Sequence, residues 1–61
     1  QNRAIVRAAE KRAGYKLSTA ARRDVISYAA RYGGDSSKKQ LTYARQWGDG
    51  VRFMKDKYGA G

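Results

Sequence analysis

The chain has 61 residues and a formal charge of +9, with fourteen Lys and Arg against five Asp and Glu, and it contains neither cysteine nor histidine. This length supports one domain, which is either a whole protein or a fragment of a longer one. Without cysteine the chain has no disulfide and no thiolate nucleophile. Without histidine it lacks the residue that most often serves as general base and as metal ligand.

The first predicted helix covers residues 2–13 and ends at Gly14, since glycine readily adopts the left-handed backbone that closes a helix. Its apolar side is formed by aliphatic and small residues, namely Ile5, Val6, Ala8, Ala9 and Ala13. Residues 15–17 make a short connection to the next element.

The second predicted helix begins at a Ser18 or Thr19 cap and continues to about Tyr32. Gly33 and Gly34 supply its C-terminal stop. Apolar residues recur along it at spacings of three and four, the pattern of an amphipathic helix, and they are Ala21, Val25, Ile26, Tyr28, Ala29 and Tyr32.

The third predicted helix begins after Ser36 or Ser37, and Ser37 with Gln40 fits a capping box. Its apolar stripe consists of Leu41, Ala44, Trp47, Val51, Met54 and Tyr58. The stripe crosses Gly48-Asp49-Gly50 without losing register, which favours one bent helix. Two interior glycines cost a helix about 2 kcal/mol, however, so a break with Asp49 as a new cap is the alternative.

The expected fold is all-α, a small three-helix domain, or four helices if the third breaks at Gly48-Asp49-Gly50. No alternating strand pattern occurs. We expect Tyr43 and Phe53 at the edge of the core. The predicted core residues are Ile5, Val6, Leu17, Val25, Ile26, Leu41, Trp47, Val51 and Met54.

An enzyme is not expected, and neither is a cofactor or a metal. The chain offers no nucleophile with a base, no pair of carboxylates and no metal-ligand cluster. Its five acidic residues are scattered one or two to a segment. Two of them are explained by helical i, i+4 pairs, Arg45 with Asp49 and Arg52 with Asp56.

Several basic residues lie where local structure disfavours them. Pairs of basic residues fall in the first turns of the second and third helices, where they oppose the helix dipole, and three more share one edge of the first helix. A bound phosphate would make the electrostatic interactions of these basic residues favourable. For any single residue a solubilising role also suffices, but the set predicts anion binding. The candidate nucleic-acid-binding residues are Lys38, Lys39, Ser37, Gln40, Thr42, Arg45, Arg22, Arg23, Arg3, Arg7 and Lys11.

Residues 19–47 could form a helix-turn-helix-like unit, in which the start of the second helix meets base edges and phosphates. Lys39 would then face the DNA backbone. The connecting segment GGDSS is longer than the usual turn of that motif. The bihelix is therefore one candidate mode among others.

The segment SSKKQLTYARQWGDGVRFMKDKYG, residues 36–59, has a Ser-rich start, spaced aromatic residues and an exit that contains Lys and Tyr-Gly. In these features it resembles the opening helix of the SAM-like core-binding domains of phage-type tyrosine recombinases (integrases). The resemblance implies a helical DNA-clamping piece. The catalytic Arg, His and Tyr constellation of that family cannot be placed here, because histidine is absent.

The sequence therefore predicts a basic helical domain that contacts the phosphate backbone of double-stranded DNA, in a phage, mobile-element or regulatory protein. The alternatives are a module that binds an acidic protein and a module that binds RNA. A membrane partner is not expected, because the apolar faces are mostly alanine, and nothing indicates a homodimer. The absence of disulfides favours a cytoplasmic or nucleoid-associated location.

Overall fold

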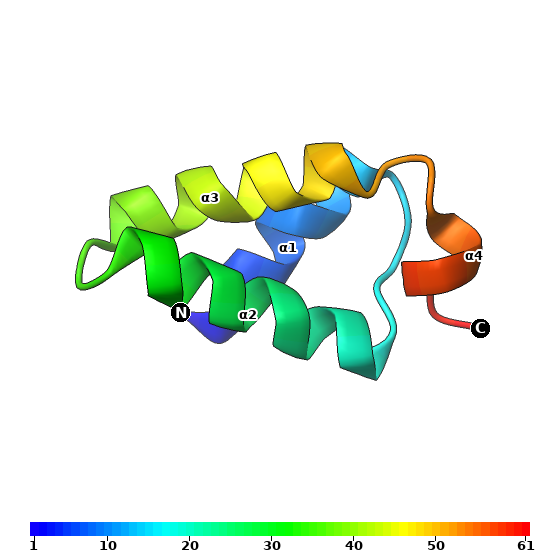
Figure 1. The fold of residues 1–61 in the computed structure, drawn as a ribbon, viewed down its shortest axis with the longest axis horizontal. Helices are drawn as coiled ribbons and strands as arrows, with labels where there is room; N and C mark the ends of the chain where they lie inside the picture. Colours follow the sequence, from blue (N-terminus) through cyan, green and yellow to red (C-terminus); the bar gives the residue numbers. More distant parts are fainter.

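The computed structural model describes residues 1–61 and contains four helices (Figure 1). They are α1 (Asn2–Ala13), α2 (Thr19–Gly33), α3 (Ser37–Gly50) and the short α4 (Lys55–Tyr58). The only β-type pairing is an isolated bridge between Leu17 and Gly59. The predicted all-α fold is confirmed, in its four-helix form.

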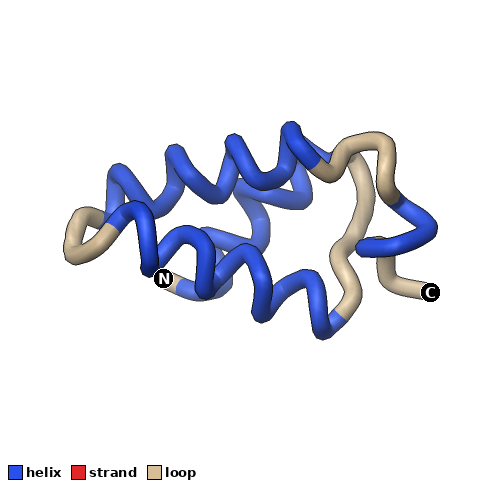
Figure 2. The backbone as a smooth tube through the Cα atoms, in the orientation of Figure 1, coloured by secondary structure: helices blue, strands red, loops and turns tan.

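Helices α2 and α3 run back along one another from the turn that joins them and diverge toward α4, while α1 crosses behind the pair (Figure 1, Figure 2). The α1–α2 connection and the C-terminal segment meet at the open end of this hairpin. There the Ser18 amide donates to the Tyr58 carbonyl and the Ala60 amide to the Lys16 carbonyl, both at 2.8 Å. These two bonds join the α1–α2 connection to the C-terminal segment.

The core is narrow and built largely from small side chains. Its buried members are Ile5, Ala9, Ala13, Leu17, Ala21, Val25, Ala29, Ala44 and Val51. Four other predicted core residues are half-buried against this cluster, namely Val6, Ile26, Leu41 and Trp47. Met54 is exposed, so its assignment to the core was wrong.

The favoured single helix through Gly48-Asp49-Gly50 is wrong, because α3 ends at Gly50 and the chain turns before α4 begins. The Tyr15 hydroxyl donates to the Val51 carbonyl at 2.5 Å and fixes this turn to the α1–α2 connection. Asp49 caps nothing and lies inside α3.

The two predicted i, i+4 ion pairs are not formed. Asp49 instead lies 3.6 Å from Arg12 of α1, a pair in which both side chains are about half exposed. Arg52 lies in the turn after α3 and Asp56 in α4, so the helical spacing that would join them is lost. Asp49 therefore links two helices and does not stabilise its own.

The N-caps of α2 and α3 are serines. Ser18 accepts from the Ala21 amide, as expected, and Ser36 accepts from the Lys39 amide at 3.2 Å. The Ser37–Gln40 capping box is therefore wrong by one residue. Phe53, expected at the edge of the core, is 90% exposed in the turn after α3.

Tyr43 does lie at the core edge, half-buried and in contact with two other tyrosines. Its ring centroid is 6.1 Å from that of Tyr28 and 5.7 Å from that of Tyr32. The two α2 rings are 4.7 Å apart. These aromatic side chains line the rim of the seam between α2 and α3.

Candidate nucleic-acid interface

All fourteen basic side chains are exposed, and only one of them has an acidic partner. Arg12 is that residue, and no other Lys or Arg lies within 4.0 Å of a carboxylate. The positive charge is therefore free to act on a ligand rather than being neutralised within the fold. A surface of this kind attracts polyanions over a range set by ionic strength.

The structure brings together three of the predicted arginines, from two helices. Arg3 and Arg7 of α1 and Arg22 of α2 line one groove of about 350 Å³ between these helices. Half-buried Val6 and Ile26 also line this groove. We call it the arginine groove.

One carboxylate shares the arginine groove, and it has a structural partner. Glu10 also lines this groove, and its Oε2 accepts a hydrogen bond from the Leu17 amide at 2.9 Å. That bond holds the α1–α2 connection against α1. Three guanidinium groups thus share the groove with one hydrogen-bonded carboxylate, and the groove keeps a net positive charge.

A second basic group lies at the start of α3, where Lys38 and Lys39 fall in the first helical turn. The Gln1 side chain donates to the Gln40 side chain at 3.2 Å, so the first turn of α1 lies beside the first turn of α3. Arg3 lies in that first turn of α1. The two basic groups therefore follow one another along the molecule.

Two predicted contact residues are already engaged in the fold. The Gln40 side-chain amide donates to the Gly34 carbonyl at 2.5 Å, which ties α3 to the end of α2. The Thr42 hydroxyl donates to the Lys38 carbonyl at 3.1 Å, one turn back on its own helix. Base reading by either residue would require these bonds to be exchanged.

The remaining candidates are exposed, and Ser37 adjoins one of the two basic groups. Ser37 starts α3 next to the lysines, whereas Arg45 lies further along α3 and Lys11 toward the end of α1. Arg23 is absent from the lining of the arginine groove although it adjoins Arg22, because consecutive helical residues point about 100° apart. The basic pair that starts α2 is thus split between two faces.

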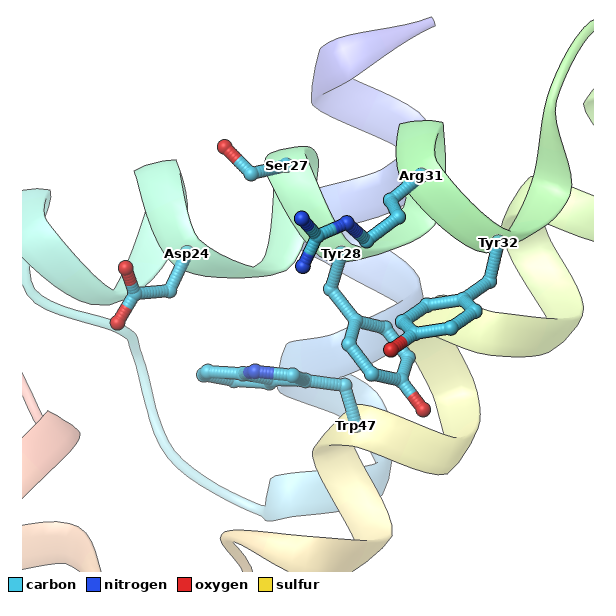
Figure 3. A pocket seen from close by; sticks show the side chains of 6 residues that line it. All are labelled: Asp24, Ser27, Tyr28, Arg31, Tyr32 and Trp47. Carbon is cyan, nitrogen blue, oxygen red and sulfur yellow. The ribbon is translucent and has the colours of Figure 1, made fainter.

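A third feature, which sequence reasoning missed, is a groove of about 290 Å³ between α2 and α3 (Figure 3). Its lining residues are Asp24, Ser27, Tyr28, Arg31, Tyr32 and Trp47. We call it the aromatic groove. The α2 members recur at spacings of three and four, so one helical face carries both the aromatic and the charged residues. That periodicity was the available signal, but Tyr28 and Trp47 were predicted only to pack against the core.

Comparisons of the chain with protein-family models, with curated proteins and with solved structures return no match. Fold and surface alone therefore define the class, a small all-α domain with a strongly basic exterior. None of its helices combines the length and the apolar character that crossing a membrane requires. No three acidic side chains are clustered where they could hold a metal ion.

Proposed function

We propose that this domain binds the phosphate backbone of nucleic acid, with double-stranded DNA as the preferred form. The observation that carries the proposal is that thirteen of the fourteen exposed basic side chains have no acidic partner. A fold that used these charges for its own stability would pair them. Phosphate contacts from Lys and Arg supply most of the affinity in sequence-independent DNA binding.

The size of the molecule suits a duplex of about one turn. Its longest dimension is 32 Å, close to the roughly 34–36 Å that one turn of duplex occupies. The arginine groove contributes three cations and the start of α3 contributes two. Five phosphate contacts predict a slope of about −4.5 for the logarithm of affinity against the logarithm of salt concentration.

The experiment is fluorescence anisotropy with a labelled 16-base-pair duplex at salt concentrations between 50 and 200 mM. We expect the affinity to fall by about 500-fold over this range, as the slope above requires. An affinity that stays constant as salt rises would exclude phosphate contact as the mechanism.

Charge-removing variants locate the interface. Replacing Lys38 and Lys39 together by alanine should reduce the magnitude of the salt slope by about 2, since each lost phosphate contact reduces it by about 1. Replacing Arg7 and Arg22 together by alanine should do the same for the arginine groove. Lys57→Ala is the control, because Lys57 belongs to α4 at the opposite end of the molecule from the α2–α3 turn (Figure 1).

The alternatives make different predictions in the same assay. An RNA-binding module would bind an RNA duplex or hairpin more tightly than the DNA duplex at equal salt. A module for an acidic protein would bind neither at physiological salt and would retain an acidic polypeptide instead. The proposal favours DNA, because the longest dimension of the molecule, 32 Å, is close to the length of one turn of B-form duplex.

A further inference from the structure

The aromatic groove holds a half-exposed indole between charged groups that have no partner in the fold. Figure 3 shows the Trp47 ring with the Asp24 carboxylate beyond one end and the Arg31 guanidinium above it. The rings of Tyr28 and Tyr32 lie at its other side. Neither charged side chain makes an ion pair or a hydrogen bond within the protein, so both are free to meet a ligand.

The aromatic rings of this groove are held in place by the fold. Trp47 makes an edge-on contact with Tyr58, with ring centroids 5.5 Å apart. Tyr32 is 52% exposed, yet it contacts both Tyr28 and Tyr43. A planar ligand would thus meet a surface that needs little ordering on binding, which lowers the entropic cost of association.

We propose that the aromatic groove binds one unpaired guanine base of a nucleic-acid strand. The inference rests on the proposed function, since the basic surface would bring the strand to the groove. Stacking on an aromatic ring is the usual way in which proteins hold unpaired bases. The base must be unpaired, because pairing occupies its Watson–Crick edge and stacking in a duplex covers both its faces.

The two charged groups select guanine among the bases. Guanine carries two adjacent donors on its Watson–Crick edge, N1–H and the N2 amino group, which match the two oxygens of the Asp24 carboxylate. Its O6 and N7 acceptors match the forked donors of Arg31. Adenine would place its N1 acceptor against the carboxylate, and cytosine and thymine each offer a single donor position on that edge.

A cationic ligand is the main competitor for an aromatic groove, and the charges here argue against it. The guanidinium of Arg31 lines the groove and the chain as a whole carries +9, so a second cation would be repelled. A nucleotide brings negative phosphates to the same surface. Charge complementarity therefore favours the nucleic-acid base.

The probe is a twelve-residue oligothymidylate that carries one central guanine, compared with the same strand carrying adenine, inosine or 7-deazaguanine at that position. Trp47 is the only tryptophan of the chain, so its fluorescence reports on this groove alone. We expect guanine to bind about tenfold more tightly than adenine. Inosine, which lacks the N2 amino group, and 7-deazaguanine, which lacks N7, should each lose a large part of that preference.

The diagnostic variant is Asp24→Asn, with Asp35→Asn in the α2–α3 turn as its matched control. Both substitutions remove one exposed negative charge, so both should strengthen binding of plain oligothymidylate slightly. Only the change at Asp24 should also abolish the preference for guanine over adenine. Neither variant removes an apolar contact, and circular dichroism should show that each remains helical.

Failure of the inference is distinguishable from failure of the proposed function. Equal affinities for the guanine and adenine strands in both the oligothymidylate and the oligouridylate series, or equal effects of the two Asn variants, would overturn the inference while salt-dependent duplex binding left the proposed function standing. A guanine preference that persists in a blunt duplex would also overturn it. If neither duplex nor single strand binds at low salt, both fail. An oligouridylate series with the same substitutions shows whether DNA or RNA supplies the guanine, because the preferred strand binds more tightly. If neither series shows a preference for guanine, the inference is refuted.

Discussion

Replacing Gly48 by alanine should destabilise the fold, although Gly48 lies inside a helix where alanine is normally better. Gly48 is buried in α3, where this helix crosses α1. A Cβ atom at this position would clash with the backbone carbonyl of Ala9 and lie 3.0 Å from the Cβ of Arg12. The missing side chain is therefore what lets α1 and α3 approach so closely.

The magnitude follows from two opposing terms. Alanine gains about 1 kcal/mol over glycine at an interior helix position. Forcing a methyl group into a packed site costs about 1–3 kcal/mol, and the upper end applies here because the obstructing atom is backbone and cannot rotate away. The net loss is about 2 kcal/mol, close to half of the roughly 3–5 kcal/mol that a core of this size supplies.

Urea titration followed by circular dichroism measures this loss, with Gly50→Ala as the matched control. A Cβ at Gly50 would meet no atom within 4 Å, so that variant should be unchanged or more stable by up to about 1 kcal/mol. Thermal melts should show a decrease of about 8–16 °C for the variant at Gly48. A variant at Gly48 as stable as the parent would refute the close α1–α3 contact.

Four further substitutions test individual residues of the fold. Ser36→Ala should lower the free energy of unfolding by about 1 kcal/mol, because Ser36 caps α3. Its control, Ser37→Ala, should change this free energy by less than about 0.5 kcal/mol. Equal losses of stability in urea titration would contradict the assignment of Ser36 as the cap. Tyr15→Phe should lower it by about 1 kcal/mol through loss of the bond to the Val51 carbonyl. Burial is the main cause that raises the pKa of Tyr15 above its ordinary value of 10.0, so the folded state prefers the neutral phenol. The stability that this preference contributes is complete below pH 10 and is lost as the pH rises through the pKa of the folded state. In thermal melts between pH 9 and 12, the melting temperature should therefore decline less for the Phe variant than for the parent. Phe53→Ser should leave the free energy of unfolding within about 0.5 kcal/mol of the parent, since the ring is 90% exposed.

The helix boundaries that were predicted correctly from the sequence are those marked by a glycine that ends a helix or a serine that caps one. Gly14 adopts a positive φ of 83° after α1, and Ser18 caps α2 through its own side chain. The end of α3 was mispredicted because helical register does not prove a helix. Val51 keeps the spacing of the apolar stripe and is buried, yet it lies just beyond the helix and is held by Tyr15.

The basic residues of the candidate interface could be identified from the sequence, but their grouping could not. Arg7 and Arg22 meet only because α1 crosses α2 at this point, a tertiary contact with no local signal. The same holds for Asp49, whose partner is Arg12 of another helix rather than Arg45 of its own. Helical spacing did not predict the ion pair of Asp49, and residues that are brought together by helix crossing can be identified only from the fold.

The aromatic groove follows from how the core is built. Five of the nine buried core residues are alanines, namely Ala9, Ala13, Ala21, Ala29 and Ala44. Small residues draw the helices together, and no room remains between them for large rings. Tyr32 and Trp47 are therefore placed along the rim of the α2–α3 seam, where each keeps one side exposed. Packing accounts for the rings at this rim but does not require Asp24 and Arg31 beside them, and it is these two unpaired charges that point to a ligand.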